Sequence, residues 1–135
     1  MDYYRNAKDN EEIARIAYDN GKYQVSIALI CLSIELYLKS RLNLVEYPLD
    51  LDISHDILGI YKCIAKRYKY KKNLTASMTF SRKYYTEARY PFSDSSEVYT
   101  KEFCEEFLSR LDDVKDYVDN YCIPDLKDLQ NKFNK

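Results

Sequence analysis

Glycine and proline are scarce in this sequence of 135 residues, with two and three copies respectively, and tryptophan is absent. Folds rich in β-structure need many tight turns, and glycine and proline are among the residues that favour them. The scarcity therefore argues against a sandwich or barrel and favours a few long helices joined by short connections. Fifteen tyrosines supply most of the aromatic residues, and tyrosine rings can pack in a core while the hydroxyl keeps a polar partner.

Long apolar runs and catalytic or metal-binding motifs are also missing. No stretch approaches the roughly 20 apolar residues that a membrane span needs, and the charged residues 1–5 lack the apolar core of a secretion signal. The sequence has a single histidine and no glycine-rich phosphate loop, HExxH motif or acidic metal cluster. We therefore expect a cytoplasmic protein with no transmembrane helix, no bound metal and no cofactor.

The four cysteines lie far apart and form no CxxC pair. Neither a zinc site nor a disulfide framework fits this spacing in a cytosolic chain. Free cysteine behaves as a small hydrophobe and is often buried. We expect four unpaired thiols on helix faces, at Cys31, Cys63, Cys104 and Cys122.

Apolar residues recur at helical spacing along most of the chain, and capping residues mark where helices begin. The predicted helices cover residues 3–19, 22–44, 55–70 and 73–89, a long segment after residue 100, and a short segment over 124–133. Ser54, Asn73 and Thr100 are the expected N-caps. Short connections imply antiparallel neighbours. The predicted fold is therefore one all-α domain over residues 1–135, an up-and-down antiparallel bundle of four to five main helices plus a short C-terminal helix.

The apolar residues also suggest how three of these helices pack. The first helix carries a stripe of Ile13, Ile16 and Ala17, and residues 25–38 are apolar on nearly every side. A helix that is apolar all round belongs in the centre of a bundle or in a subunit interface. The stripe of the long helix after Thr100 consists of Phe103, Phe107, Leu111, Val114, Val118 and Tyr121.

Basic residues are concentrated in one part of the chain. The net charge is −1, but residues 62–89 carry +8, whereas residues 1–61 carry −4 and residues 90–135 carry −5. Two explanations stay open. The run is either a solvated helix end, where lysine and arginine favour the dipole, or a patch that binds phosphates and stacks bases on interleaved tyrosines. The patch residues are Lys62, Lys66, Arg67, Lys69, Lys71, Lys72, Arg82 and Lys83.

Two polar positions stand out from the apolar segments. Glu35 is the only charged residue between positions 23 and 38, and Lys39 follows at i+4. The pair either lies on the helix surface or holds a carboxylate near a pocket, since acidic residues are rarely buried without a partner. His55, followed by Asp56 at a helix N-terminus, is either a structural residue or part of an anion site.

Three segments, in this order, resemble the HEPN domain, the higher-eukaryote and prokaryote nucleotide-binding family. The first is Gly21-Lys22-Tyr23 with the apolar helix that ends Ile34-Glu35-Leu36-Tyr37-Leu38-Lys39-Ser40, the second is His55-Asp56-Ile57-Leu58, and the third is Tyr85-Thr86-Glu87-Ala88-Arg89-Tyr90-Pro91. With the last long helix, the likeness spans roughly residues 3–120. It implies a bundle of four to five helices that usually dimerises and is often encoded beside a minimal nucleotidyltransferase.

One motif of the family is missing. Ribonuclease members carry an arginine followed closely by a histidine on one helix, and the pair handles the RNA backbone. Here the nearest upstream arginine, Arg41, lies fourteen positions before His55. The ribonuclease motif of the family therefore has no counterpart in this sequence, and we expect this chain not to be an enzyme.

The expected function is that of a non-catalytic HEPN-like domain. It would bind a nucleotide or a nucleic-acid phosphate such as that of RNA, or pair with a nucleotidyltransferase partner, and it would form a homodimer. Two alternatives remain: a toxin-type ribonuclease with an unorthodox His55–Arg89 site, and a structural or regulatory interaction module, as in a toxin–antitoxin pair. The predicted ligand-binding residues are Glu35, Lys39, His55, Asp56, Arg89 and Tyr90.

Overall fold

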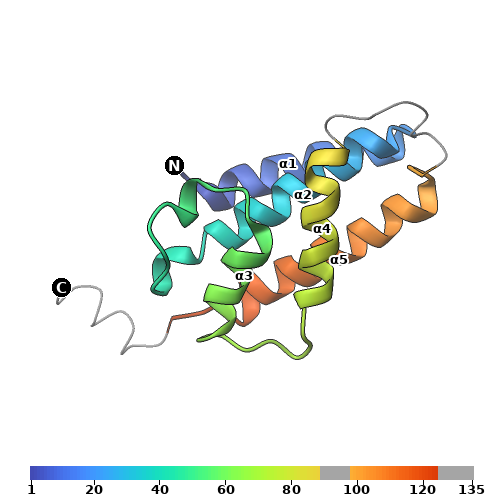
Figure 1. Ribbon diagram of the computed structural model, residues 1–135. Helices are drawn as coiled ribbons and strands as arrows, with labels where there is room; N and C mark the ends of the chain where they lie inside the picture. Colours follow the sequence, from blue (N-terminus) through green and yellow to red (C-terminus); the bar gives the residue numbers. More distant parts are fainter. Residues whose placement is uncertain (89–97, 125–135) are drawn as a thin grey trace.

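The computed structural model describes residues 1–88 and 98–124, and these residues form helices and loops with no strand (Figure 1). The five α-helices are α1 (Tyr3–Asp19), α2 (Tyr23–Lys39), α3 (Ile57–Ala65), α4 (Thr75–Glu87) and α5 (Lys101–Asn120). Two short 3₁₀ turns, η1 (Leu42–Leu44) and η2 (Leu51–Ile53), lie between α2 and α3. The predicted all-α class is confirmed. Apart from its first residue, Pro124, the predicted terminal helix lies outside the described residues.

Helix α2 lies at the centre of the bundle and packs against each of the other four α-helices (Figure 1). The chain turns sharply after α1, so α1 and α2 are antiparallel neighbours. α5 runs beside α2 in the same direction, because Arg41 at the end of α2 contacts Val118 near the end of α5. Most of the apolar sequence of α2 is therefore covered within its own bundle, as the first of the two predicted placements requires, although Val25 near its start is 53% exposed.

The core stripe of α5 is confirmed in its central part. Phe107, Leu111, Val114 and Val118 are completely buried, whereas Tyr121 at the end of the stripe is exposed. Thr100 caps the helix as predicted, because its side-chain oxygen accepts a hydrogen bond from the Phe103 amide.

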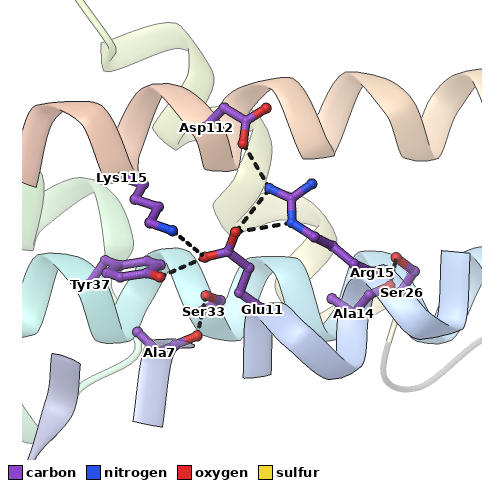
Figure 2. Close-up of polar contacts among 9 residues, drawn as sticks. All are labelled: Ala7, Glu11, Ala14, Arg15, Ser26, Ser33, Tyr37, Asp112 and Lys115. Carbon is purple, nitrogen blue, oxygen red and sulfur yellow. Dashed lines mark hydrogen bonds and ion pairs between the residues drawn. The ribbon is translucent and has the colours of Figure 1, made fainter. Parts of the chain in front are cut away.

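The stripe predicted for α1 is wrong for its two largest residues. Ile13 and Ile16 are 53% and 54% exposed, and the buried positions are Ala7, Glu11, Ala14 and Ala17. Helix α1 turns its small residues inward because its backbone lies close to α2. The hydroxyls of Ser26 and Ser33 on α2 donate hydrogen bonds to the carbonyls of Ala14 and Ala7 on α1, at 2.7 and 2.8 Å (Figure 2). A large apolar side chain at either alanine would separate the two backbones.

Several predicted helix ends differ from the structure. α2 ends at Lys39, five residues early, and the chain continues into η1. α3 begins at Ile57 with Asp56 as its N-cap, not Ser54, and it ends at Ala65. The carbonyl of Tyr68 accepts a hydrogen bond from the buried Tyr117 hydroxyl on α5, and this tertiary contact holds residues after α3 outside the helix. The expected cap of α4, Asn73, instead accepts a hydrogen bond from the Thr75 amide, and α4 has Leu74 as its N-cap.

The four cysteines are free, as predicted, and only Cys63 is not buried. Burial raises the pKa of the Cys31 thiol to about 12 and that of Cys122 to about 11, so both are protonated at neutral pH. Among the described residues, no helix is long and apolar enough to cross a membrane.

Candidate functional site

The carboxylate of Glu35 is the centre of the predicted site. Glu35 is only 2% exposed, and its two oxygens contact different partners: Oε2 lies 3.4 Å from Lys39 Nζ, and Oε1 lies 3.0 Å from His55 Nδ1. Glu35 and Lys39 are one helical turn apart at the end of α2, whereas His55 comes from the connection before α3. The pair is buried, so the surface-pair explanation is wrong and the structure joins three of the six predicted ligand residues.

Tyr85 on α4 completes this cluster, although it was not among the predicted site residues. Its hydroxyl lies 3.2 Å from His55 Nδ1, and its ring stacks on the imidazole with centroids 5.3 Å apart. With Glu35 as acceptor, the proton belongs on His55 Nδ1, which leaves Nε2 as an acceptor in the neutral ring. The one available signal was the position of Tyr85 at the start of the third HEPN-like segment.

The imidazole of His55 contacts protein groups at Nδ1, whereas most of its side chain faces solvent. Its side chain is 64% exposed although its partners Glu35 and Tyr85 are both buried. A buried carboxylate thus orients a solvent-facing imidazole, much as a buried carboxylate orients histidine in many functional sites. The arrangement can offer a proton donor or acceptor to a solute in a fixed direction.

Asp56 has a mainly structural contact in this structure. Its Oδ1 accepts a hydrogen bond of 3.0 Å from the Gly59 amide and so caps α3. A Cβ atom at Gly59 would lie 2.4 Å from Asp56 Oδ2, which explains the glycine at this helical position. Arg82 on α4 approaches the same carboxylate, with Nη1 at 3.5 Å. One residue of the basic patch is therefore brought next to the His55 cluster.

The other predicted patch residues do not form one continuous cationic surface. All eight are exposed, but Lys71 and Lys72 form ion pairs with Asp116 and Asp113 on α5, at 3.4 and 2.9 Å. Hydrogen bonds from Tyr70 and Asn120, with the contact of Lys71, lower the pKa of Asp116 below its ordinary value. Part of the +8 segment is thus neutralised by the acidic segment that follows it.

One lysine of the patch fits the helix-end explanation. The ammonium of Lys69 donates to the carbonyl of Ala65, the last residue of α3, at 2.9 Å. Lys62, Lys66 and Lys83 are exposed on α3, on the end of α3 and on α4. Arg89 and Tyr90, the last two predicted ligand residues, lie outside the described residues.

A second polar cluster, around Glu11, was not predicted (Figure 2). Glu11 on α1 is buried, and its carboxylate accepts a 2.6 Å hydrogen bond from the Tyr37 hydroxyl on α2. Arg15 bonds the same carboxylate at 2.9 Å and also reaches Asp112 on α5 at 2.7 Å, while Lys115 lies 3.6 Å from Glu11. The cluster joins α1, α2 and α5, so its first role is to hold the bundle together.

The sequence matches the HEPN domain family over residues 1–121, nearly its whole length, and the chain belongs to this family. Comparisons with curated proteins and with solved structures found no match. The predicted family is thereby confirmed. The His55 cluster also lies on the segments that carried the resemblance, at the end of α2, before α3 and on α4.

Proposed function

We propose that this HEPN domain is a non-catalytic module that binds a phosphate group of RNA or of a nucleotide. The observation that carries the proposal is the exposed imidazole of His55, oriented by the buried Glu35 and flanked by Arg82. A buried ion pair such as Glu35–Lys39 is costly to desolvate, and a pair that also orients a surface imidazole fits a binding role. Exposed Lys62, Lys66 and Lys83 would add phosphate contacts that are indifferent to base sequence.

The first test is binding of a fluorescently labelled single-stranded RNA. We expect His55→Ala to weaken binding about three- to tenfold, the effect of removing one ordinary hydrogen bond. Lys62→Glu/Lys66→Glu should weaken it further and make the salt dependence shallower, by about 0.7 in the log–log slope for each phosphate that the variant no longer neutralises. Lys8→Glu/Lys22→Glu changes the net charge equally on α1 and before α2 and serves as the control. Equal affinities for wild type and His55→Ala would contradict the proposal.

The second test is cleavage. We expect no significant turnover of structured or single-stranded RNA, because cleavage needs a proton carrier and a cation at one phosphate. In the described part of the chain, Lys39 of the His55 cluster is paired with Glu35, and Arg82 is paired with Asp56, the residue after His55. Gel analysis of purified protein with RNA checks this. Turnover that His55→Ala abolishes would establish the ribonuclease alternative instead.

A homodimer, a nucleotidyltransferase partner, a toxin–antitoxin role and a cytoplasmic location remain proposals. The sequence argued for a dimer from the apolar surface of α2, but most of that surface is covered within the bundle. The exposed Ile13 and Ile16, three residues apart on α1, are the apolar surface that a second copy would cover. Substitution of both isoleucines by glutamate would be the direct way to prevent such a dimer.

A further inference from the structure

A pocket of about 350 Å³ lies between the first turn of α1, the end of α2 and the connection that follows α2, and His55 does not line it. This volume falls within the range of small-ligand sites. The charged side chains in its lining are Asp2, Lys39, Arg41 and Asp52, two negative and two positive. A ligand that fits should therefore carry little net charge, and its own charges should match those lining groups that lack a partner.

Two of these four charges already have partners within the protein. The ammonium of Lys39 lies 3.4 Å from the buried carboxylate of Glu35, and the Lys39 side chain is only 6% exposed. The carboxylate of Asp2 caps α1 by accepting a hydrogen bond from the Arg5 amide, at the positive end of the helix dipole. Lys39 and Asp2 are therefore not the groups that a ligand would neutralise.

Arg41 is a cation of the pocket without a carboxylate partner. Its Nε donates to the Val118 carbonyl at 3.2 Å and its Nη1 to the Ser40 hydroxyl at 3.3 Å. In the part of the chain that the structure describes, no acidic side chain forms an ion pair with it. Asp119, the residue after Val118, instead accepts a hydrogen bond from the Tyr4 hydroxyl at 2.8 Å. The two contacts of Arg41 use two of the five N–H groups of a guanidinium, and the others can hold a carboxylate through two hydrogen bonds.

Asp52 is a carboxylate of the pocket without a partner. It lies in η2 and is half-buried. Among the residues that the structure describes, its side chain forms neither a hydrogen bond nor an ion pair. Arg41 and Asp52 thus line the same pocket without pairing with each other. The pocket presents one unpaired cation and one unpaired carboxylate, which suits a ligand that carries both charges.

Tyrosine rings supply the aromatic part of the pocket. The ring of Tyr4 contacts that of Tyr37 edge-on, with centroids 5.4 Å apart, and the ring of Tyr3 lies 5.9 Å from Lys39 Nζ. Tyr47 is 40% exposed and lies on the connection after η1. Aromatic rings pack favourably against one another in offset or edge-on contacts. The part of the ligand that carries no charge is therefore expected to be aromatic.

We propose that this pocket binds a free α-amino acid with an aromatic side chain, with its carboxylate at Arg41, its ammonium at Asp52 and its ring against Tyr47. Such a ligand carries both charges at neutral pH and is neutral overall, as the lining of the pocket requires. The site does not include His55 or the basic residues of α3 and α4. It does not rest on the function proposed above, and either can fail without the other.

The test is titration of ¹⁵N-labelled full-length protein with L-phenylalanine, with N-acetyl-L-phenylalanine, which lacks the ammonium, and with L-phenylalaninamide, which lacks the carboxylate. We expect L-phenylalanine to cause saturable shifts in the amide signals of Tyr3, Ser40, Arg41, Asn43 and Tyr47. Each derivative should bind at the same residues at least about tenfold more weakly, because one charge-assisted contact is lost. No saturable shifts with L-phenylalanine, shifts confined to α3 and α4, or an equal affinity for either derivative would each overturn the proposal.

Variants check which residue binds which charge of the ligand. Asp52→Asn should weaken binding of L-phenylalanine about tenfold but leave the affinity for N-acetyl-L-phenylalanine nearly unchanged, because that ligand has no ammonium. Arg41→Gln should weaken binding of L-phenylalanine by a similar factor but spare L-phenylalaninamide, which has no carboxylate. A purely structural role of either residue would instead weaken the binding of both ligands alike, because only a direct contact couples a side chain to one ligand group.

Matched controls are available for both variants. Asp50→Asn and Arg5→Gln change exposed residues that do not line the pocket, and asparagine tolerates the left-handed backbone of Asp50. Both controls should bind L-phenylalanine like wild type. Folded Asp52→Asn and Arg41→Gln proteins that bind L-phenylalanine as wild type does would refute the site.

Discussion

Substitution Glu35→Ala is expected to lower the free energy of unfolding by about 3 to 5 kcal/mol, the range seen when one partner of a buried ion pair is removed. The reason lies in Lys39, whose side chain is 6% exposed and whose ammonium has Glu35 as its carboxylate partner. Without that carboxylate, the ammonium either stays buried and unpaired or reaches solvent only if the end of α2 rearranges, and both outcomes cost folding free energy. Denaturant unfolding followed by circular dichroism at pH 7 measures the decrease.

A double variant separates the cost of the unpaired charge from that of weaker packing. Glu35→Leu/Lys39→Met removes both charges and keeps similar volume, and such replacements are often neutral or stabilising. We expect its stability to lie within about 1 kcal/mol of wild type, or above it. It should nevertheless bind RNA more weakly, because His55 loses the carboxylate that orients it. If the double variant were as unstable as Glu35→Ala, the unpaired ammonium would not be the cause.

The second large effect is expected at Glu11. Substitution Glu11→Ala should cost about 2 kcal/mol, because it leaves the buried Tyr37 hydroxyl without its acceptor and removes the ion pair with Arg15. The contribution of Arg15 itself is small, since its side chain is 41% exposed and solvent screens the pair. Glu12→Ala, at the exposed neighbouring position on α1, is the matched control and should change stability by less than about 0.5 kcal/mol.

The effect at Glu11 should also depend on pH. Burial by itself raises the pKa of Glu11, but hydrogen bonds from Tyr37 and Arg15 and the charge of Lys115 outweigh it, so the pKa lies below its ordinary value of 4.5. A lowered folded-state pKa gives stability that is present above pH 4.5 and is lost as the pH falls through the folded-state value. The stability gap between wild type and Glu11→Gln should therefore narrow below pH 4.5. A gap that widens on acidification would contradict this assignment.

Local patterns in the sequence were enough to predict the helices and one buried face. Helical spacing predicted that Phe107, Leu111, Val114 and Val118 share the core side of α5, and a capping threonine predicted where that helix begins. Spacing within one helix likewise predicted the Glu35–Lys39 contact. These features depend on residues within one or two turns of each other, so a single sequence contains the information.

Contacts between distant segments were decided by the tertiary structure alone. The close approach of α1 to α2 turned alanines inward and left Ile13 and Ile16 exposed, and nothing local to α1 indicates that distance. The same packing buried Glu35, placed Tyr85 against His55 and paired Lys71 with Asp116. Residues 30 or more positions apart in the chain meet only when whole helices dock, and the docking depends on the shapes of all the side chains between them.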